Sequence, residues 1–158
     1  MAYSYDRRGA APSKKRLEGF AREFATDFSY PLGSCDLGRG DCDTMSNVFL
    51  DYLDDAGVAG NLLAGDGFIP PLGRDANPMW VMLTGDKAFK KGDKGLNHVV
   101  VQVGKWVVDL TGAQFGSAFK DPIYPVSVFK SRWQQTGYTN RANRDINNLR
   151  RMLLRGEL

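Results

Sequence analysis

The chain has 158 residues, 42% of them hydrophobic and 11% aromatic, and a formal net charge of +3. This length suits one domain with a substantial core, and the apolar content excludes a disordered chain. Two cysteines are too few for a disulfide scaffold, and with the single histidine, His98, they cannot supply all four ligands of a structural zinc site. We therefore expect no metal or other cofactor, and any imidazole chemistry must use His98.

The first predicted elements are a flexible arm over residues 1–12 and a helix over residues 14–28. The arm lacks the apolar stretch of a signal peptide, and no window of 18 apolar residues follows, so we expect a cytoplasmic protein without a membrane span. Ser13 can cap the helix, whose apolar residues recur at three- and four-residue spacing.

A second helix is predicted after the glycine-rich loop 29–40. Its apolar residues follow helical spacing from Met45 to Ala56. Asp41 or Asp43 can cap its start, and Gly57 ends it where a left-handed residue is favoured.

Strands dominate the remainder, and two stretches, 65–78 and 85–95, separate them as loops. The predicted strands cover residues 58–63, 79–84, 99–103, 106–110 and 122–129. The order of helices and strands indicates an α+β domain over residues 13–138, with N-terminal helices packed on a small, mostly antiparallel sheet.

A basic helix or tail is predicted at the C-terminal end, residues 139–158, with its helical part at 141–154. Residues 130–158 carry seven basic and two acidic groups, whereas residues 31–129 carry eight and twelve. A basic tail can bind nucleic acid or an acidic partner. The alternative, which we favour, is a solvated helix face.

The hairpin 99–110 places the only histidine. If Gly104 and Lys105 form a two-residue type II′ turn, Val103 pairs with Trp106. One face of the hairpin is then entirely apolar, and His98 and Asp109 share the other face as diagonal neighbours. Diagonal Cβ atoms lie about 7 Å apart, within reach of an imidazole–carboxylate hydrogen bond.

Cys42 is the candidate nucleophile, because it lies in the first turn of the second helix. The positive end of the helix dipole favours a thiolate there, and the free backbone N–H groups can bind an oxyanion. His98 would then act as base and acid, and Asp109 would orient the imidazole. The alternatives are a buried structural cysteine, a surface histidine bonded to water and a strand-end carboxylate. Cys35, in a loop, is the second candidate thiol.

Two segments resemble a known family. Residues 40–58, which begin Gly-Asp-Cys-Asp-Thr and end Ala-Gly-Val, are similar to the nucleophile helix of transglutaminase-like members of the papain-fold cysteine enzymes. Residues 97–111 resemble that family's His and Asp strands, with Gly-Lys-Trp between them and Asp-x-Thr at the end. NlpC-type peptidoglycan hydrolases, which also open a helix with Asp-Cys, are the second choice.

The resemblance implies a papain-like or transglutaminase-like fold and a thiol enzyme acting on amide bonds of a protein or peptide: a peptidase, amidase, glutamine deamidase or transglutaminase. Asp41, Trp80 and Asn97 are then expected to bind substrate, although a core position is the alternative for Trp80. The family's oxyanion Gln before the cysteine is missing, so the backbone N–H of Cys42 is the expected donor. The competing class is an inactive relative that serves as a structural or interaction component of a larger assembly.

Overall fold

The computed structural model describes residues 12–29, 32, 41–66 and 97–135. Several predictions lie outside the described residues. These are nearly all of the arm 1–12, Cys35, the strand 79–84 with Trp80, the loop 85–95, and the C-terminal segment 139–158 with its helix 141–154.

The described chain is an α+β structure in which every paired strand is antiparallel, as predicted. Four strands follow one another as neighbours, and a short fifth strand returns to the edge beside the first, giving the order β4-β3-β2-β1-β5. The strands are β1 Asn61–Asp66, β2 Asn97–Val103, β3 Trp106–Val108, β4 Ile123–Pro125 and β5 Gln134–Gln135. The helices are α2 Lys14–Asp27, α3 Asp41–Asp55 and α5 Val126–Arg132, with short 3-10 turns η1 Gly112–Phe115 and η2 Ser117–Phe119.

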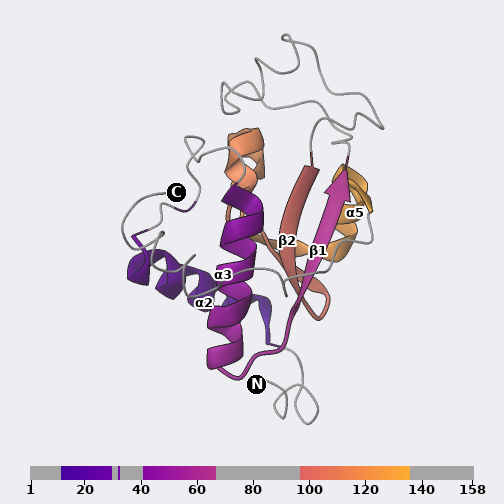
Figure 1. Cartoon of the computed structure of the whole chain (residues 1–158). Helices are drawn as coiled ribbons and strands as arrows, with labels where there is room; N and C mark the ends of the chain where they lie inside the picture. Colours follow the sequence, from indigo (N-terminus) through magenta and orange to yellow (C-terminus); the bar gives the residue numbers. More distant parts are fainter. Residues whose placement is uncertain (1–11, 30–31, 33–40, 67–96, 136–158) are drawn as a thin grey trace.

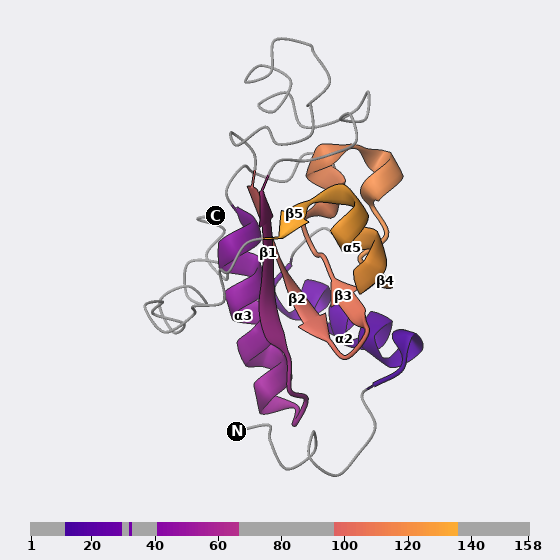
Figure 2. The same ribbon diagram turned by 90° about the vertical axis from the view of Figure 1, so that its right-hand side faces the viewer.

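Helices cover both faces of the sheet (Figures 1 and 2). Seen edge-on in Figure 2, the sheet lies between α3 on one side and α5 with the 3-10 turns on the other. One buried cluster joins α2 and α3 to the first face, and a second joins Phe115, Phe129 and Trp133 to the opposite face. No helix among the described residues is long and apolar enough to cross a membrane.

The start of α2 and the end of α3 follow the sequence closely, whereas the predicted caps of α3, Asp41 and Asp43, both lie inside that helix. Ser13 Oγ accepts a hydrogen bond from the backbone N–H of Arg16 at 3.2 Å, which confirms the predicted cap of α2. At the end of α3, Gly57 has φ +80°. The N–H of Gly57 donates to the carbonyl of Asp54, and the N–H of Val58 donates to the carbonyl of Leu53. This pair of bonds is a Schellman motif, which requires the left-handed glycine.

The hairpin register is also confirmed. Val103 pairs with Trp106 and Val101 with Val108, on either side of Gly104 and Lys105. Gly104 has φ +60°, and Ser29 is the sole non-glycine residue with positive φ among those described, so Lys105 has the negative φ of a type II′ turn.

Four strand predictions were wrong in extent. The strand predicted at 99–103 begins earlier, at Asn97, and the strand predicted at 106–110 ends at Val108. The strand predicted at 58–63 begins only at Asn61. Val58 instead donates its backbone N–H to Leu53 in the motif that ends α3, and its side chain is 1% exposed there. The strand predicted at 122–129 keeps three residues and then becomes α5. Helical spacing brings Phe129 and Trp133 together on the second cluster, and this burial outweighs the strand preference of the two valines in α5.

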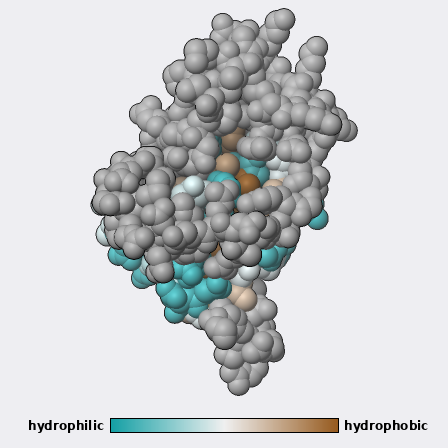
Figure 3. All heavy atoms as spheres, in the orientation of Figure 1, coloured by the Kyte–Doolittle hydropathy of each residue, from teal (hydrophilic) through white to brown (hydrophobic). Residues whose placement is uncertain are grey.

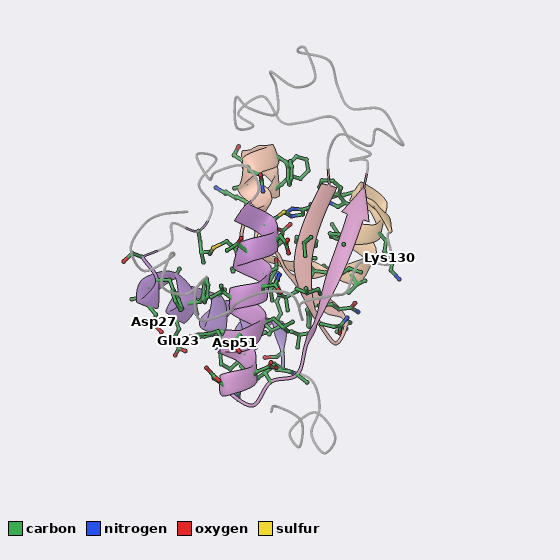
Figure 4. The ribbon with its side chains drawn as sticks, in the orientation of Figure 1. Glu23, Asp27, Asp51 and Lys130 are labelled. Carbon is green, nitrogen blue, oxygen red and sulfur yellow. The ribbon has the colours of Figure 1, made fainter. Side chains whose placement is uncertain are left out.

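An acidic surface lies where α2 meets α3. Glu23 and Asp27 of α2 and Asp51 of α3 lie on the same side of the molecule in Figure 4, in the region where hydrophilic residues gather in Figure 3. The hydroxyl of Tyr52 donates to Glu23 and to Asp27, at 3.3 Å each. Partial burial and the two carboxylates raise the pKa of Tyr52 to about 12.

Candidate active site

Cys42 lies in the first turn of α3 as a free thiol and is 7% exposed. One turn further along the helix, the buried Ser46 hydroxyl donates a hydrogen bond of 2.8 Å to the backbone carbonyl of Val99. Val99 follows His98 directly in β2. This bond therefore fixes the beginning of α3 against the beginning of β2, where the histidine is located.

His98 and Asp109 form a buried pair across the hairpin. His98 Nε2 and Asp109 Oδ1 are 2.8 Å apart, and the two residues are 0% and 5% exposed. The predicted sharing of one face by these residues is confirmed, and the alternative of a surface histidine bonded to water is wrong. The backbone N–H of Asp109 bonds to the carbonyl of Pro122 at 2.7 Å, which holds the carboxylate just beyond the end of β3.

The charges of this pair support each other. Burial alone would lower the pKa of His98, but the charge and hydrogen bond of Asp109, followed by the interaction with Cys42, raise it to about 10. Burial likewise opposes ionisation of Asp109, yet His98, the hydroxyl of Tyr124 and the positive charge of Arg132 hold the pKa of this carboxyl below its usual range. At neutral pH the pair is therefore an imidazolium and a carboxylate.

Cys42 interacts with the imidazole of His98, and this interaction adds to the raised pKa of the histidine. The Nε2 atom of the ring is bonded to Asp109, so Nδ1 is the ring nitrogen left for the thiol. Among the described residues Nδ1 has no hydrogen-bond partner. A thiol that interacts with an imidazole, and an imidazole bonded to a carboxylate, are the groups that a thiol nucleophile with an oriented base requires.

Aromatic side chains close the site around the histidine. The Trp133 ring stacks on the imidazole with centroids 5.2 Å apart, and Phe115 meets it edge-on at 4.9 Å. On the far side of Asp109, the hydroxyl of Tyr124 donates to Oδ2 at 2.6 Å. The side chains of His98 and Asp109 are therefore shielded from solvent, which strengthens their electrostatic interaction.

None of these three aromatic residues was predicted from the sequence to belong to the site. Tyr124 pairs with Val107, which shares the face of His98, but the connection between β3 and β4 has no turn signal from which this register could be read. Trp133 could have been found from its four-residue spacing to Phe129, had that segment been recognised as a helix.

The side chains of the predicted substrate-binding residues lie outside the described part of the structure. The backbone of Asn97 pairs with Asp66 at the start of β2, and Asp41 begins α3, but the side chains of Asp41 and Asn97 are not described. Trp80 lies outside the described residues. Within the described ranges, no three His, Cys, Asp or Glu side chains gather as a metal site.

Comparisons with protein-family models, curated proteins and solved structures give no match to this chain.

Proposed function

We propose that this protein is a thiol-dependent hydrolase or acyltransferase acting on amide or thioester carbonyls, with Cys42 as nucleophile, His98 as base and acid, and Asp109 as the group that orients the imidazole. A papain-like or transglutaminase-like fold is part of this proposal. The observation that carries it is the buried His98–Asp109 hydrogen bond of 2.8 Å, together with the interaction of Cys42 with the imidazole of His98.

Each step of the proposed reaction uses one of these groups. The Cys42 sulfur, as thiolate beside the imidazolium, attacks the carbonyl carbon to form a tetrahedral intermediate. The C–N or C–S bond then breaks, His98 gives its proton to the leaving amine or thiol, and a thioester to Cys42 remains. Water or an amine attacks this thioester and loses a proton to His98, which releases the acyl group and restores the thiolate.

The position of Cys42 supports charge stabilisation during these steps. The first N–H groups of a helix have no acceptor within the helix, so the backbone at the start of α3 can donate to the oxyanion. The positive end of the helix dipole also stabilises negative charge that develops at the start of α3.

The proposal is tested by alkylation. Iodoacetamide at pH 7, with the modified peptides quantified by mass spectrometry, should label Cys42 far faster than Cys35 in the same molecule. His98→Ala should abolish this difference, because it removes the positive partner of the sulfur. Incubation with an acyl thioester should then leave an acyl group on Cys42 of the wild type and not of the His98→Ala variant.

Equal and slow labelling of both cysteines would overturn the proposal. It would favour the competing class, in which the same residues form a structural buried pair in a protein that acts as a component of an assembly.

A further inference from the structure

The carboxylate of Asp109 has a second strong partner, on the side away from His98. The hydroxyl of Tyr124 donates to Oδ2 at 2.6 Å, while Oδ1 bonds to the imidazole at 2.8 Å. Both carboxylate oxygens are thus fixed by side chains from different strands, β4 and β2. With each oxygen held, the plane of the carboxylate cannot rotate without breaking a buried hydrogen bond.

Arg132 of α5 supports the phenol in turn. Its guanidinium lies 4.7 Å from the centre of the Tyr124 ring and 4.8 Å from that of Phe119, so it is held between two aromatic rings. The guanidinium charge also acts on Asp109 and Tyr124. By contrast Lys130, on the same helix, is exposed and points outward into solvent (Figure 4).

The space around Asp109 is fitted to this arrangement. A Cβ atom added at Gly112 would lie 2.8 Å from Asp109 Oδ2 and 2.8 Å from the carbonyl oxygen of Phe119. The carboxylate therefore has Gly112 close on one side and the phenol bonded to it on another. A side chain larger than glycine at position 112 would therefore displace this carboxylate.

We propose that Tyr124 is a positioning residue for the reaction proposed above: its hydroxyl, braced by Arg132, fixes Asp109 Oδ2 so that Oδ1 is aimed at His98 Nε2. This inference rests on the proposed function. The groups that face Asp109 are His98 from β2, Tyr124 from β4 and Arg132 from α5, and Cys42 from α3 acts through the imidazole.

Removal of the hydroxyl has a consequence of definite sign. The hydrogen bond from Tyr124 favours the ionised form of Asp109, so its loss raises the pKa of that carboxyl. The carboxylate is then protonated at a higher pH, so the ion pair between Asp109 and the imidazolium is lost at a higher pH. The shift expected for a hydrogen bond to a charged group is about one to two pH units.

The test compares Tyr124→Phe with Tyr52→Phe, which also removes a phenol hydroxyl bonded to carboxylates, on the acidic surface of α2 and α3. The rate of Cys42 alkylation is measured against pH, and the imidazole signals of His98 are followed by NMR. Since the chain has one histidine, every imidazole signal belongs to His98. Tyr124→Phe should move the acid limb of the alkylation profile up by about one pH unit, and so lower the rate about tenfold at a pH on the steep part of that limb. Tyr52→Phe should leave both unchanged.

A second pair of variants covers the case in which Tyr124→Phe does not fold. Arg132→Gln leaves the hydroxyl in place and should shift the acid limb in the same direction by a smaller amount, whereas Lys130→Gln should not shift it. If the acid limb is unchanged in both Tyr124→Phe and Arg132→Gln although Cys42 is still alkylated far faster than Cys35, this inference is overturned and the proposed function stands. A shift in the His98 titration without any change in alkylation overturns the role in the reaction and leaves a structural hydrogen bond. If Cys42 and Cys35 of the wild type are alkylated at the same rate, the proposed function itself is overturned.

Discussion

Replacement of Asp109 by Asn removes the charge that holds the proton on His98 and keeps the shape of the side chain. In the wild type the pKa of His98 is raised from 6.5 to about 10. At 1.36 kcal/mol per pH unit this difference corresponds to about 5 kcal/mol. Removing one partner of a buried ion pair lowers the free energy of unfolding by about 3–5 kcal/mol. We therefore expect Asp109→Asn to lower the free energy of unfolding by about 3–5 kcal/mol at pH 6.

The dependence of this loss on pH follows from the direction of each shift. The pKa of His98 is raised in the folded protein, so its contribution is fully present below pH 6.5 and disappears as the pH rises through about 10. The pKa of Asp109 is lowered, so its contribution is present above the ordinary carboxyl value and is lost as the pH falls below it. The stability difference between wild type and variant should thus be largest near pH 5–6 and shrink towards pH 10.

Two measurements check this prediction. Urea unfolding at pH 6, 8 and 10 gives the stability difference, and NMR of the single histidine gives its pKa in each protein. In Asp109→Asn only burial and Cys42 act on the imidazole, so His98 should titrate far below pH 10. A variant in which His98 is still protonated at pH 9, or a stability difference that is the same at pH 6 and pH 10, would refute the account of the buried pair.

Two matched pairs of variants test the surroundings of the site. Gly112→Ala and Gly60→Ala should each destabilise the folded protein by about 1–3 kcal/mol, since both add a Cβ within 3.0 Å of other atoms. Only Gly112→Ala should lower the pKa of His98, because its Cβ displaces Asp109. The same His98 pKa in both variants would contradict this. Ser46→Ala should cost about 1–2 kcal/mol and slow Cys42 alkylation, because it removes the buried bond between α3 and β2. The control Ser131→Ala removes an exposed 2.7 Å bond to a carbonyl of its own helix and should change stability by less than about 0.5 kcal/mol. If urea unfolding gives the same loss of stability for Ser46→Ala and Ser131→Ala, the α3–β2 bond contributes no more than an exposed bond.

The parts of the structure that could be predicted are those determined by local chemistry. Ser13, Gly57 and Gly104 each act within a few residues of their own position, so the caps and the hairpin turn could be read from the sequence. The hairpin turn then determined the register of β2 and β3, and this register placed His98 beside Asp109.

The parts that could not be predicted depend on contacts between distant segments. The valine-containing segment after Pro125 reads as a strand, yet it forms α5, because Phe129 and Trp133 are buried against the second face of the sheet. Tyr124 reaches Asp109 only through the pairing of β4 with β3, and no short-range signal determines that pairing. The histidine was thus identified, but its aromatic and phenolic surroundings were not.

The two-residue turn at Gly104 and Lys105 has a consequence for how this chain can change through evolution. Insertion of a single residue into the turn would move Asp109 to the opposite face of the hairpin, towards α3 and away from the imidazole. Loops elsewhere in the chain can lengthen without this effect, but the interval of eleven residues between His98 and Asp109 cannot. Distant relatives that keep the buried pair should therefore share this fixed interval with a glycine turn inside it, even where little other similarity survives.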